Sequence, residues 1–334
     1  MRAPATPDAG LQWADDELLA GFVATRMPAS PVVAGRPAAS VAAGRSDPVM
    51  TLVRRAGAPA EARGVVVHLH GYNDYFFQEH LADAVEAAGY AFVALDARRA
   101  GRSWRLGEVP HYQDDLREQG TDLSAAVAAA RRLHPGVPVV VHAHSTGGLV
   151  AALWAHAYRE HGGPDGLLLD SPFLAAPPGT LIRDEAVRPL ARLRPLAPLS
   201  SRPSHYAAHL LADEGGAWHF DTRLKRPEGL PARAGWYAAV RAGQVRVARG
   251  LAIACPVLVA HSDSSGPDRP DNPDLGRQDT VLDVRAVSPL APGLGPDVAV
   301  RQIEGGVHDL LLSAPEPRAA YLAAVGDFLE RVAP

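Results

Sequence analysis

The stretch Ala143-His144-Ser145-Thr146-Gly147 decides the fold of this chain. The apolar run VPVVV at residues 137–141 precedes it, and the run GLVAALW at residues 148–154 follows it. A buried strand therefore leads into a serine and turns at once into a helix. Small residues flank the serine because such a turn drives it toward positive φ and leaves little room for neighbouring side chains. We predict a sharp strand-to-helix turn at the edge of a sheet.

This turn also predicts chemistry at Ser145. Its usual form is G-x-S-x-G, in which the backbone N–H groups at the helix N-terminus point toward any oxyanion that forms beside the serine. The first glycine is replaced here by Ala143. Ser145 is therefore a candidate nucleophile. Because short motifs also occur by chance, an ordinary turn serine remains the alternative on these five residues alone.

The composition excludes several classes of protein. The 334 residues carry a formal net charge of −4, which gives no reason to expect a nucleic-acid partner. The single cysteine, Cys255, excludes an internal disulfide and a cysteine-rich metal site. The acidic N-terminus lacks the basic-then-apolar order of a secretion signal, and no run approaches the roughly 20 apolar residues of a membrane span. We expect a cytoplasmic protein without stable membrane insertion.

Alternating apolar runs and amphipathic stretches predict an α/β chain with a mostly parallel, eight-stranded sheet. The first strand follows a short helix within residues 11–27, and residues 28–48 form a long hairpin loop or a mobile link. The other predicted strands are residues 49–54, 65–69, 91–95, 138–142, 167–169, 256–260 and 298–303. Helices are predicted at 78–88, at 113–133, directly after Ser145, and near 317–331.

The strand pattern fails between residues 173 and 250, where proline, arginine and scattered aromatic residues replace apolar runs. A sheet that is interrupted and then resumed indicates an insertion, not a second domain in tandem. We predict a core of residues 1–172 and 251–334 with an inserted cap or lid of residues 173–250.

A serine hydroxyl needs a histidine base, and an acid to orient that base, before it is a useful nucleophile. In a strand-turn-helix site of this kind the chain order is serine, acid, histidine. Among the later histidines, which include His209, His219, His261 and His308, only His308 follows the last predicted strand in a glycine-rich loop. His308 is therefore the candidate base, and an unrelated surface histidine is the alternative.

Four ordered motifs resemble those of the α/β-hydrolase superfamily, in its monoacylglycerol-lipase and serine-aminopeptidase-like (lysophospholipase-type) branch. They are the stretches 70–74 (HGYND), 95–103 (LDARRAGRS), 143–147 (AHSTG) and 306–309 (GVHD). The resemblance covers roughly residues 49–172 and 251–332. It implies the α/β-hydrolase fold, helices on both faces of the sheet, and an inserted cap. It also implies an oxyanion hole made of the backbone N–H groups of Tyr72 and Thr146.

The acid is the member of the site that the resemblance places with least precision. In the family it closely follows the seventh strand, but that position holds Ser265 here. Residues 264–278 are interpreted as a loop insertion, after which Asp279-Thr280-Val281-Leu282-Asp283 restores the family pattern, so Asp279 is the predicted acid. Asp263 is the alternative and Asp170 a more distant one. Asp283 is interpreted as structural, near the first turn of a helix.

Two further groups of residues have competing interpretations. His68, His70, His142 and His144 alternate along two strands that should be neighbours, so they could meet in a zinc or copper site; hydrogen-bonded core histidines are the favoured interpretation, and no metal is expected. The cap arginines 183, 188, 192 and 194 are interpreted as a solvated face. A minority hypothesis pairs one of them with a carboxylate of an acidic ester substrate.

Together these patterns predict a serine hydrolase that cleaves carboxylic esters through an acyl-enzyme on Ser145. His308, Asp279 and the N–H groups of Tyr72 and Thr146 complete the site, and no cofactor is required. The expected partner is a small ester with an apolar acyl or alcohol group, and the sequence does not predict an oligomeric state. The alternatives are an amide or peptide hydrolase with the same residues, an acyltransferase, and a non-catalytic binding protein with this fold.

Overall fold

The computed structural model describes residues 10–30, 48–58, 61–176, 180–199 and 204–333. A single nine-stranded sheet runs through it in the order β1-β2-β3-β5-β4-β6-β7-β8-β9. The first three pairings, up to β3 with β5, are antiparallel, and every later pairing is parallel. The strands are β1 (Ala14–Asp15), β2 (Phe22–Pro28), β3 (Val49–Arg55), β4 (Gly64–Leu69), β5 (Tyr90–Asp96), β6 (Val139–His144), β7 (Gly166–Asp170), β8 (Val257–Ser262) and β9 (Val298–Ile303).

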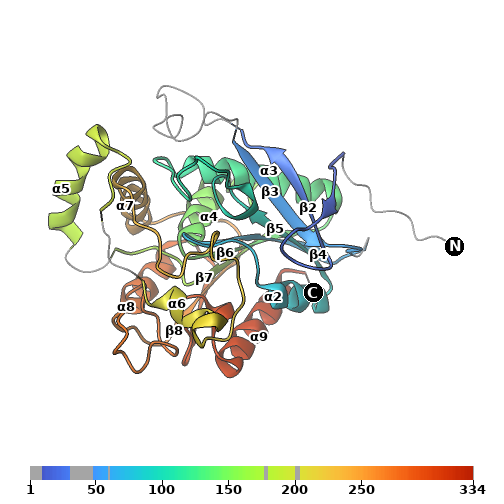
Figure 1. The fold of residues 1–334 in the computed structure, drawn as a ribbon. Helices are drawn as coiled ribbons and strands as arrows, with labels where there is room; N and C mark the ends of the chain where they lie inside the picture. The colour runs from blue at the N-terminus through green and yellow to red at the C-terminus, as the bar shows by residue number, and fades with distance from the viewer. Residues whose placement is uncertain (1–9, 31–47, 59–60, 177–179, 200–203, 334) are drawn as a thin grey trace.

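Helices cover both faces of the sheet, as a parallel sheet requires (Figure 1). On one face, α3 (Arg117–Leu133), α4 (Ser145–Ala157) and α7 (Ala234–Ala248) contribute to one apolar core. On the other, α2 (Glu79–Ala87) and α9 (Pro315–Val332) pack over a second core. The central strands β4 and β6 are buried along their whole length because each is covered from both sides. The predicted fold class is therefore confirmed.

Two details near the N-terminus differ from the prediction. Instead of a short helix before the first strand, the structure has the two-residue strand β1, which makes nine strands where eight were expected. The segment turns because the carboxylate of Asp16 accepts the N–H of Leu19 and holds Arg102 at 2.7 Å. Most of the predicted 28–48 loop lies outside the described residues.

The helix predicted from residue 113 begins only at Arg117. The carboxylate of Asp115 accepts the N–H of Arg117 at 2.9 Å, and this side-chain bond starts the helix at that point. The Gln113 side chain instead donates to Gln119 at 2.9 Å.

The described part of residues 173–250 contains three α-helices: α5 (Thr180–Leu193), α6 (Tyr206–Leu210) and α7. In Figure 1, α5 lies at the edge of the molecule, beside α7. By contrast, α7 packs directly on α4, the helix that begins at Ser145. Through α7, the segment predicted to be an insertion therefore packs on the same helix that carries the candidate nucleophile. The remaining short helix, α8 (Val284–Val287), begins after Asp283, whose side chain accepts the N–H of Arg285.

Candidate active site

The next strand after β4, β5, lies on one side of β4, and the strand after that, β6, lies on its other side. The carboxyl ends of the neighbouring strands β4 and β6 therefore lie next to each other where the order of the strands reverses. Such a switch point is where open α/β sheets form their ligand crevice. Ser145 follows β6, and the loop 70–75 follows β4. The strand pairing itself therefore brings the serine and this loop together.

Ser145 occupies the predicted turn. Its φ is 53°, in the left-handed region, and it begins α4 directly after the last residue of β6. Ala143, the first residue of the motif, is fully buried in the core, so its methyl group is accommodated by packing where the usual motif has a glycine.

Two glycines allow the loop after β4 to approach this turn closely. A Cβ atom on Gly71 would lie 3.0 Å from the Cβ of Ser145, and a Cβ on Gly147 would lie 2.3 Å from the backbone oxygen of His70. The His70 ring fixes the same loop, because its Nδ1–H donates to the oxygen of Gly71 (2.7 Å) and its Nε2 accepts the N–H of Ala97 (3.2 Å). The N–H groups of Tyr72 and Thr146 lie on the two segments thus joined, and within the described part of the chain neither has a protein acceptor.

A hydrogen-bonded chain links the serine to a histidine and a carboxylate. Ser145 Oγ lies 2.9 Å from His308 Nε2, and His308 Nδ1 lies 2.9 Å from Asp279 Oδ2. The other oxygen, Asp279 Oδ1, accepts the backbone N–H groups of Val281 and Leu282 at 2.8 Å each. An ionised carboxylate accepts hydrogen bonds and donates none, so the imidazole carries its proton on Nδ1 and presents the Nε2 lone pair to the serine hydroxyl.

The path of residues 264–278, interpreted from the sequence as a loop insertion, brings Asp279 to this position. Residues 264–278 leave the end of β8 and return, so that Ser265 and Asp279 pair through the bonds Asp279 N–H to Ser264 O and Gly266 N–H to Asp279 O, both 3.0 Å. Asp279 thus lies beside Ser265, the position where the family pattern leads one to expect the acid.

The other candidate acids have different partners. Asp263 accepts the N–H of Gly305 at 3.0 Å at the protein surface. Asp170 is buried, with one oxygen 3.9 Å from His144 Nδ1 and the other 3.4 Å from the N–H of Leu310. Asp283 caps α8, in agreement with the structural interpretation.

The four alternating histidines do not meet at one point. His68 and His142 face each other, with 2.9 Å between their Nδ1 atoms, and His142 Nε2 bonds the hydroxyl of Tyr321 at 2.8 Å. Burial lowers the pKa of both rings, to about 3 for His142, so these two are neutral core residues. His70 is bonded within its own loop, and His144 lies among carboxylates beside His308.

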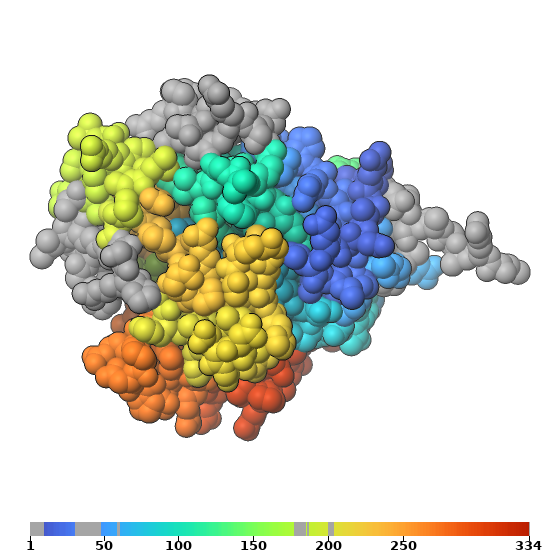
Figure 2. All heavy atoms as spheres, in the orientation of Figure 1, coloured from blue at the N-terminus to red at the C-terminus, as the bar shows by residue number. Residues whose placement is uncertain are grey.

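A cavity of about 790 Å³ opens over Ser145 and His308. It is of the size that holds a small organic ligand. Its apolar wall includes Phe173, Trp236 and Val240, and the ring of Tyr72 lies 4.3 Å from that of Trp236. In Figure 2 the surface is hollowed between α5 and the yellow-to-orange residues that follow α6.

The charged groups of this cavity are not those considered from the sequence. Lys225, Arg226, Glu228 and Arg241 line it. The side chain of Arg183 lies outside the described part of the chain. Arg188, Arg192 and Arg194 are exposed on and just after α5, away from the cavity lining. This position gives no support to the hypothesis that they pair with an acidic substrate.

Residues 221–231, which we call the cap strap because they lie in the predicted cap, contact the loop after β4. Asn73 and Arg226 exchange two hydrogen bonds of 2.9 Å between the amide side chain of Asn73 and the backbone of Arg226. The hydroxyl of Tyr72 donates to the oxygen of Pro231 at 3.2 Å, and the ammonium of Lys225 lies 2.9 Å from Asp74. These contacts link residues some 150 positions apart, so no local pattern announces them.

This fold and this arrangement around Ser145 define an α/β-hydrolase. The family model described as "Serine aminopeptidase, S33" matches residues 60–265, and the chain belongs to this family. A monoacylglycerol lipase of Mycolicibacterium smegmatis is 31% identical over 208 residues, which are 61% of this chain and 70% of that protein. The predicted serine ester hydrolase is thereby confirmed as the class of enzyme, and the peptide-hydrolase alternative is not favoured.

Solved structures agree at the level of the fold. A soluble variant of monoglyceride lipase from Saccharomyces cerevisiae, in complex with a substrate analogue, has a TM-score of 0.65 at 16% identity and covers 97% of this chain and 96% of its own. Monoacylglycerol lipase from Paleococcus ferrophilus has a TM-score of 0.60 at 18% identity, with 81% of this chain and 96% of its own covered. Among the described residues, the structure contains no helix that combines the length and the apolar character needed to cross a membrane.

Proposed function

We propose that this enzyme hydrolyses monoacylglycerols or closely related esters that join one apolar acyl chain to a small alcohol. The observation that carries the proposal is the chain of two 2.9 Å hydrogen bonds from Ser145 through His308 to Asp279, at the floor of a cavity with an apolar wall. The monoacylglycerol lipase of Mycolicibacterium smegmatis supports the choice of ester.

In this proposal Ser145 Oγ attacks the ester carbonyl carbon while His308 Nε2 takes the hydroxyl proton. Asp279 remains ionised and stabilises the imidazolium that forms. The N–H groups of Tyr72 and Thr146 donate to the developing oxyanion, and one such donor is typically worth about 3–4 kcal/mol in the transition state. His308 then gives the proton to the leaving alcohol. A water molecule, activated by the same imidazole, attacks the acyl carbon and releases the acid and Ser145.

The organisation of the chain follows from the same proposal. Residues 173–250 act as the cap that covers the acyl chain, and residues 1–172 and 251–334 act as the catalytic core. Packing of α7 on α4 supports a cap that stays attached to the nucleophile helix. A cytoplasmic location stays a prediction of the sequence.

Two experiments test the proposal. A fluorophosphonate should label the wild-type protein and fail to label Ser145→Ala, whereas equal labelling of both would exclude Ser145 as the nucleophile. Nitrophenyl esters of rising chain length, together with monoacylglycerols, should be turned over with kcat/KM at least about 100-fold above that of aminoacyl anilides. Faster turnover of the anilides would refute ester hydrolysis as the main activity.

A further inference from the structure

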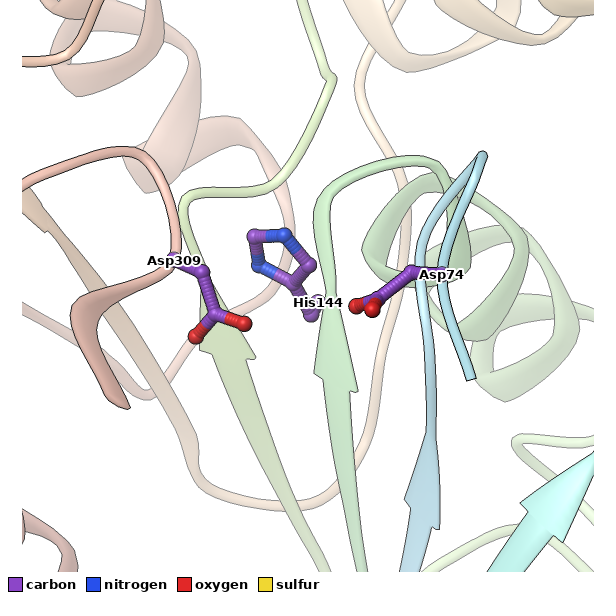
Figure 3. A group of neighbouring side chains, drawn as sticks. All are labelled: Asp74, His144 and Asp309. Carbon is purple, nitrogen blue, oxygen red and sulfur yellow. The ribbon is translucent and has the colours of Figure 1, made fainter. Parts of the chain in front are cut away.

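A cluster of buried charged groups lies directly beside the proposed catalytic residues. The ring of His144 lies between the carboxylates of Asp74 and Asp309, as Figure 3 shows. One ring nitrogen of His144 and one carboxylate oxygen each of Asp74 and Asp309 all lie within 4.8 Å of one another. Asp170 is also present, with an oxygen 3.9 Å from His144 Nδ1. All four residues are at most 5% exposed.

Several polar atoms of this cluster have no hydrogen-bond partner in the described part of the chain. They are His144 Nδ1, Asp74 Oδ2 and Asp170 Oδ2. By contrast, both oxygens of Asp309 are occupied, by the N–H of Leu311 at 3.1 Å and by the amide of Gln78 at 3.0 Å. An unpaired buried polar atom costs about 1–3 kcal/mol. Hydrogen bonds alone therefore do not account for this cluster, and the charges of its members have to be considered.

The charges of the cluster do not balance if His144 is neutral. Three carboxylates then face one ammonium group, that of Lys225, which contacts Asp74 at 2.9 Å. The other groups near His144 do not supply a second fixed cation. The Nδ1 of His308 is hydrogen-bonded to Asp279, and burial keeps His142 neutral. Buried carboxylates without a counter-charge are strongly unfavourable, and protonation of His144 would leave one net negative charge in the cluster in place of two.

His144 is the group that can supply a second positive charge. Burial by itself lowers the pKa of its ring, but the carboxylates of Asp309, Asp170 and Asp74 outweigh burial and raise the pKa to about 9. Burial also raises the pKa of Asp309, an effect that the charge of His144 opposes. The charge of His144 thus favours the ionised form of Asp309, although burial leaves the pKa of Asp309 raised on balance.

The members of the cluster are sequence neighbours of the residues to which we assign catalysis. His144 precedes Ser145, Asp309 follows His308, and Asp74 lies two residues after Tyr72. Lys225 adds the cap strap to the same cluster. One group of charges therefore connects four segments: the turn at Ser145, the loop that carries His308, the loop 70–75 after β4, and the cap strap.

We propose that His144 is a positioning residue that stays protonated, and that its charge, shared among Asp74, Asp170 and Asp309, holds these four segments in their catalytic arrangement. The catalytic part of this statement rests on the proposed function. The charge itself does not, because it predicts a stability effect that exists whether or not Ser145 is the nucleophile.

The test uses the pH dependence of thermal unfolding. The pKa of His144 is higher in the folded state than in the unfolded chain. Its contribution to the free energy of unfolding is therefore complete below the unfolded pKa of about 6.5, and it is lost as the pH rises through about 9. Between pH 7 and 10 the melting temperature of wild type should therefore fall by about 5 °C more than that of His144→Asn. The matched control is His142→Asn, which removes a buried histidine from the same strand and should keep the alkaline fall of wild type.

Charge balance supplies a second readout. At pH 7.5 His144→Asn should react with a fluorophosphonate at least about tenfold more slowly than wild type, because the carboxylates now repel one another. Asp170→Asn places a neutral amide where an oxygen has no partner. The double variant His144→Asn/Asp170→Asn should therefore recover most of the lost rate and melting temperature. A purely structural role of the imidazole ring would give no such recovery.

Three results would overturn the inference. They are an alkaline fall in His144→Asn equal to that of wild type, a double variant no better than the single one, and loss of activity in a chelator that added Zn²⁺ restores. The last result would assign the positive charge to a metal ion. If no variant or wild type reacts with the fluorophosphonate, the proposed function fails, while the melting curves still decide the charge of His144.

Discussion

Replacing Asp279 with asparagine tests the proposed acid with a change of only one atom. In wild type, Asp279 Oδ1 accepts two backbone N–H groups, from Val281 and Leu282, and Oδ2 faces the Nδ1 of His308. An asparagine side chain must keep its oxygen on the two backbone donors. Its NH₂ group then faces His308 and donates to Nδ1. The proton of the imidazole moves to Nε2, which can no longer accept the proton of Ser145.

The size of the effect follows from the alternative geometry. To restore the productive tautomer, the amide must flip, which leaves the partly buried N–H of Val281 and the buried N–H of Leu282 without an acceptor. Each unpaired group costs about 1–3 kcal/mol, so the productive state lies about 2–6 kcal/mol higher. Since each 1.36 kcal/mol is a factor of ten, we expect kcat in Asp279→Asn to fall by about 10²–10⁴.

The assay is steady-state hydrolysis of a nitrophenyl ester at pH 7.5, with a melting curve to show that the variant is folded. Asp263→Asn is the matched control, because Asp263 was the alternative acid and lies at the surface. Its kcat should stay within about threefold of wild type. A folded Asp279→Asn enzyme that loses less than tenfold in kcat, or a larger loss in Asp263→Asn, would refute the assignment of the acid.

Three further changes probe the frame around the site. Gly147→Ala should lower the melting temperature markedly and abolish fluorophosphonate labelling, because the new Cβ would lie 2.3 Å from the backbone oxygen of His70; labelling at the wild-type rate would contradict the close approach. Asn73→Ala should reduce kcat about tenfold with little change in KM, because it removes both bonds to Arg226 from the oxyanion loop. Unfolding curves should show stability falling as the pH drops below 6.5, because the pKa of His142 is lowered to about 3 and the unfolded chain binds more protons, with a shallower slope in His142→Asn.

Much of the fold was predictable because its strands are short apolar runs. The predicted strands 65–69 and 138–142 agree to within two residues with β4 and β6, because strands buried on both faces leave a continuous apolar signal. The strand β1 has only two residues, too few to show any period, so a helix was predicted in its place. The late start of α3 depends on one side-chain bond of Asp115, which periodicity does not register.

The residues of the candidate site also differ in how far the sequence indicates them. Ser145 has a local signal in its turn, and His308 is indicated by chain order. Asp279 was predicted only from a family pattern, because the position directly after the seventh strand holds Ser265. Asp74 belongs to the 70–74 motif, but no pattern in the sequence linked it to Lys225. Their ion pair joins residues 151 positions apart, and either residue alone resembles an ordinary surface charge. Long-range pairing of this kind exists only once the chain is folded.

The cap strap has a consequence for protein engineering. A designer who wished to change the acyl preference would naturally exchange residues 173–250 as one block for the cap of another hydrolase. The contacts of Asn73, Asp74 and Tyr72 with residues 225–231 mean that such a block would remove the supports of the loop 70–75, which carries the proposed oxyanion donor of Tyr72. A graft that ends before residue 221, keeping the strap with its own core, leaves those supports in place. The transferable unit is therefore smaller than the insertion that the sequence outlines.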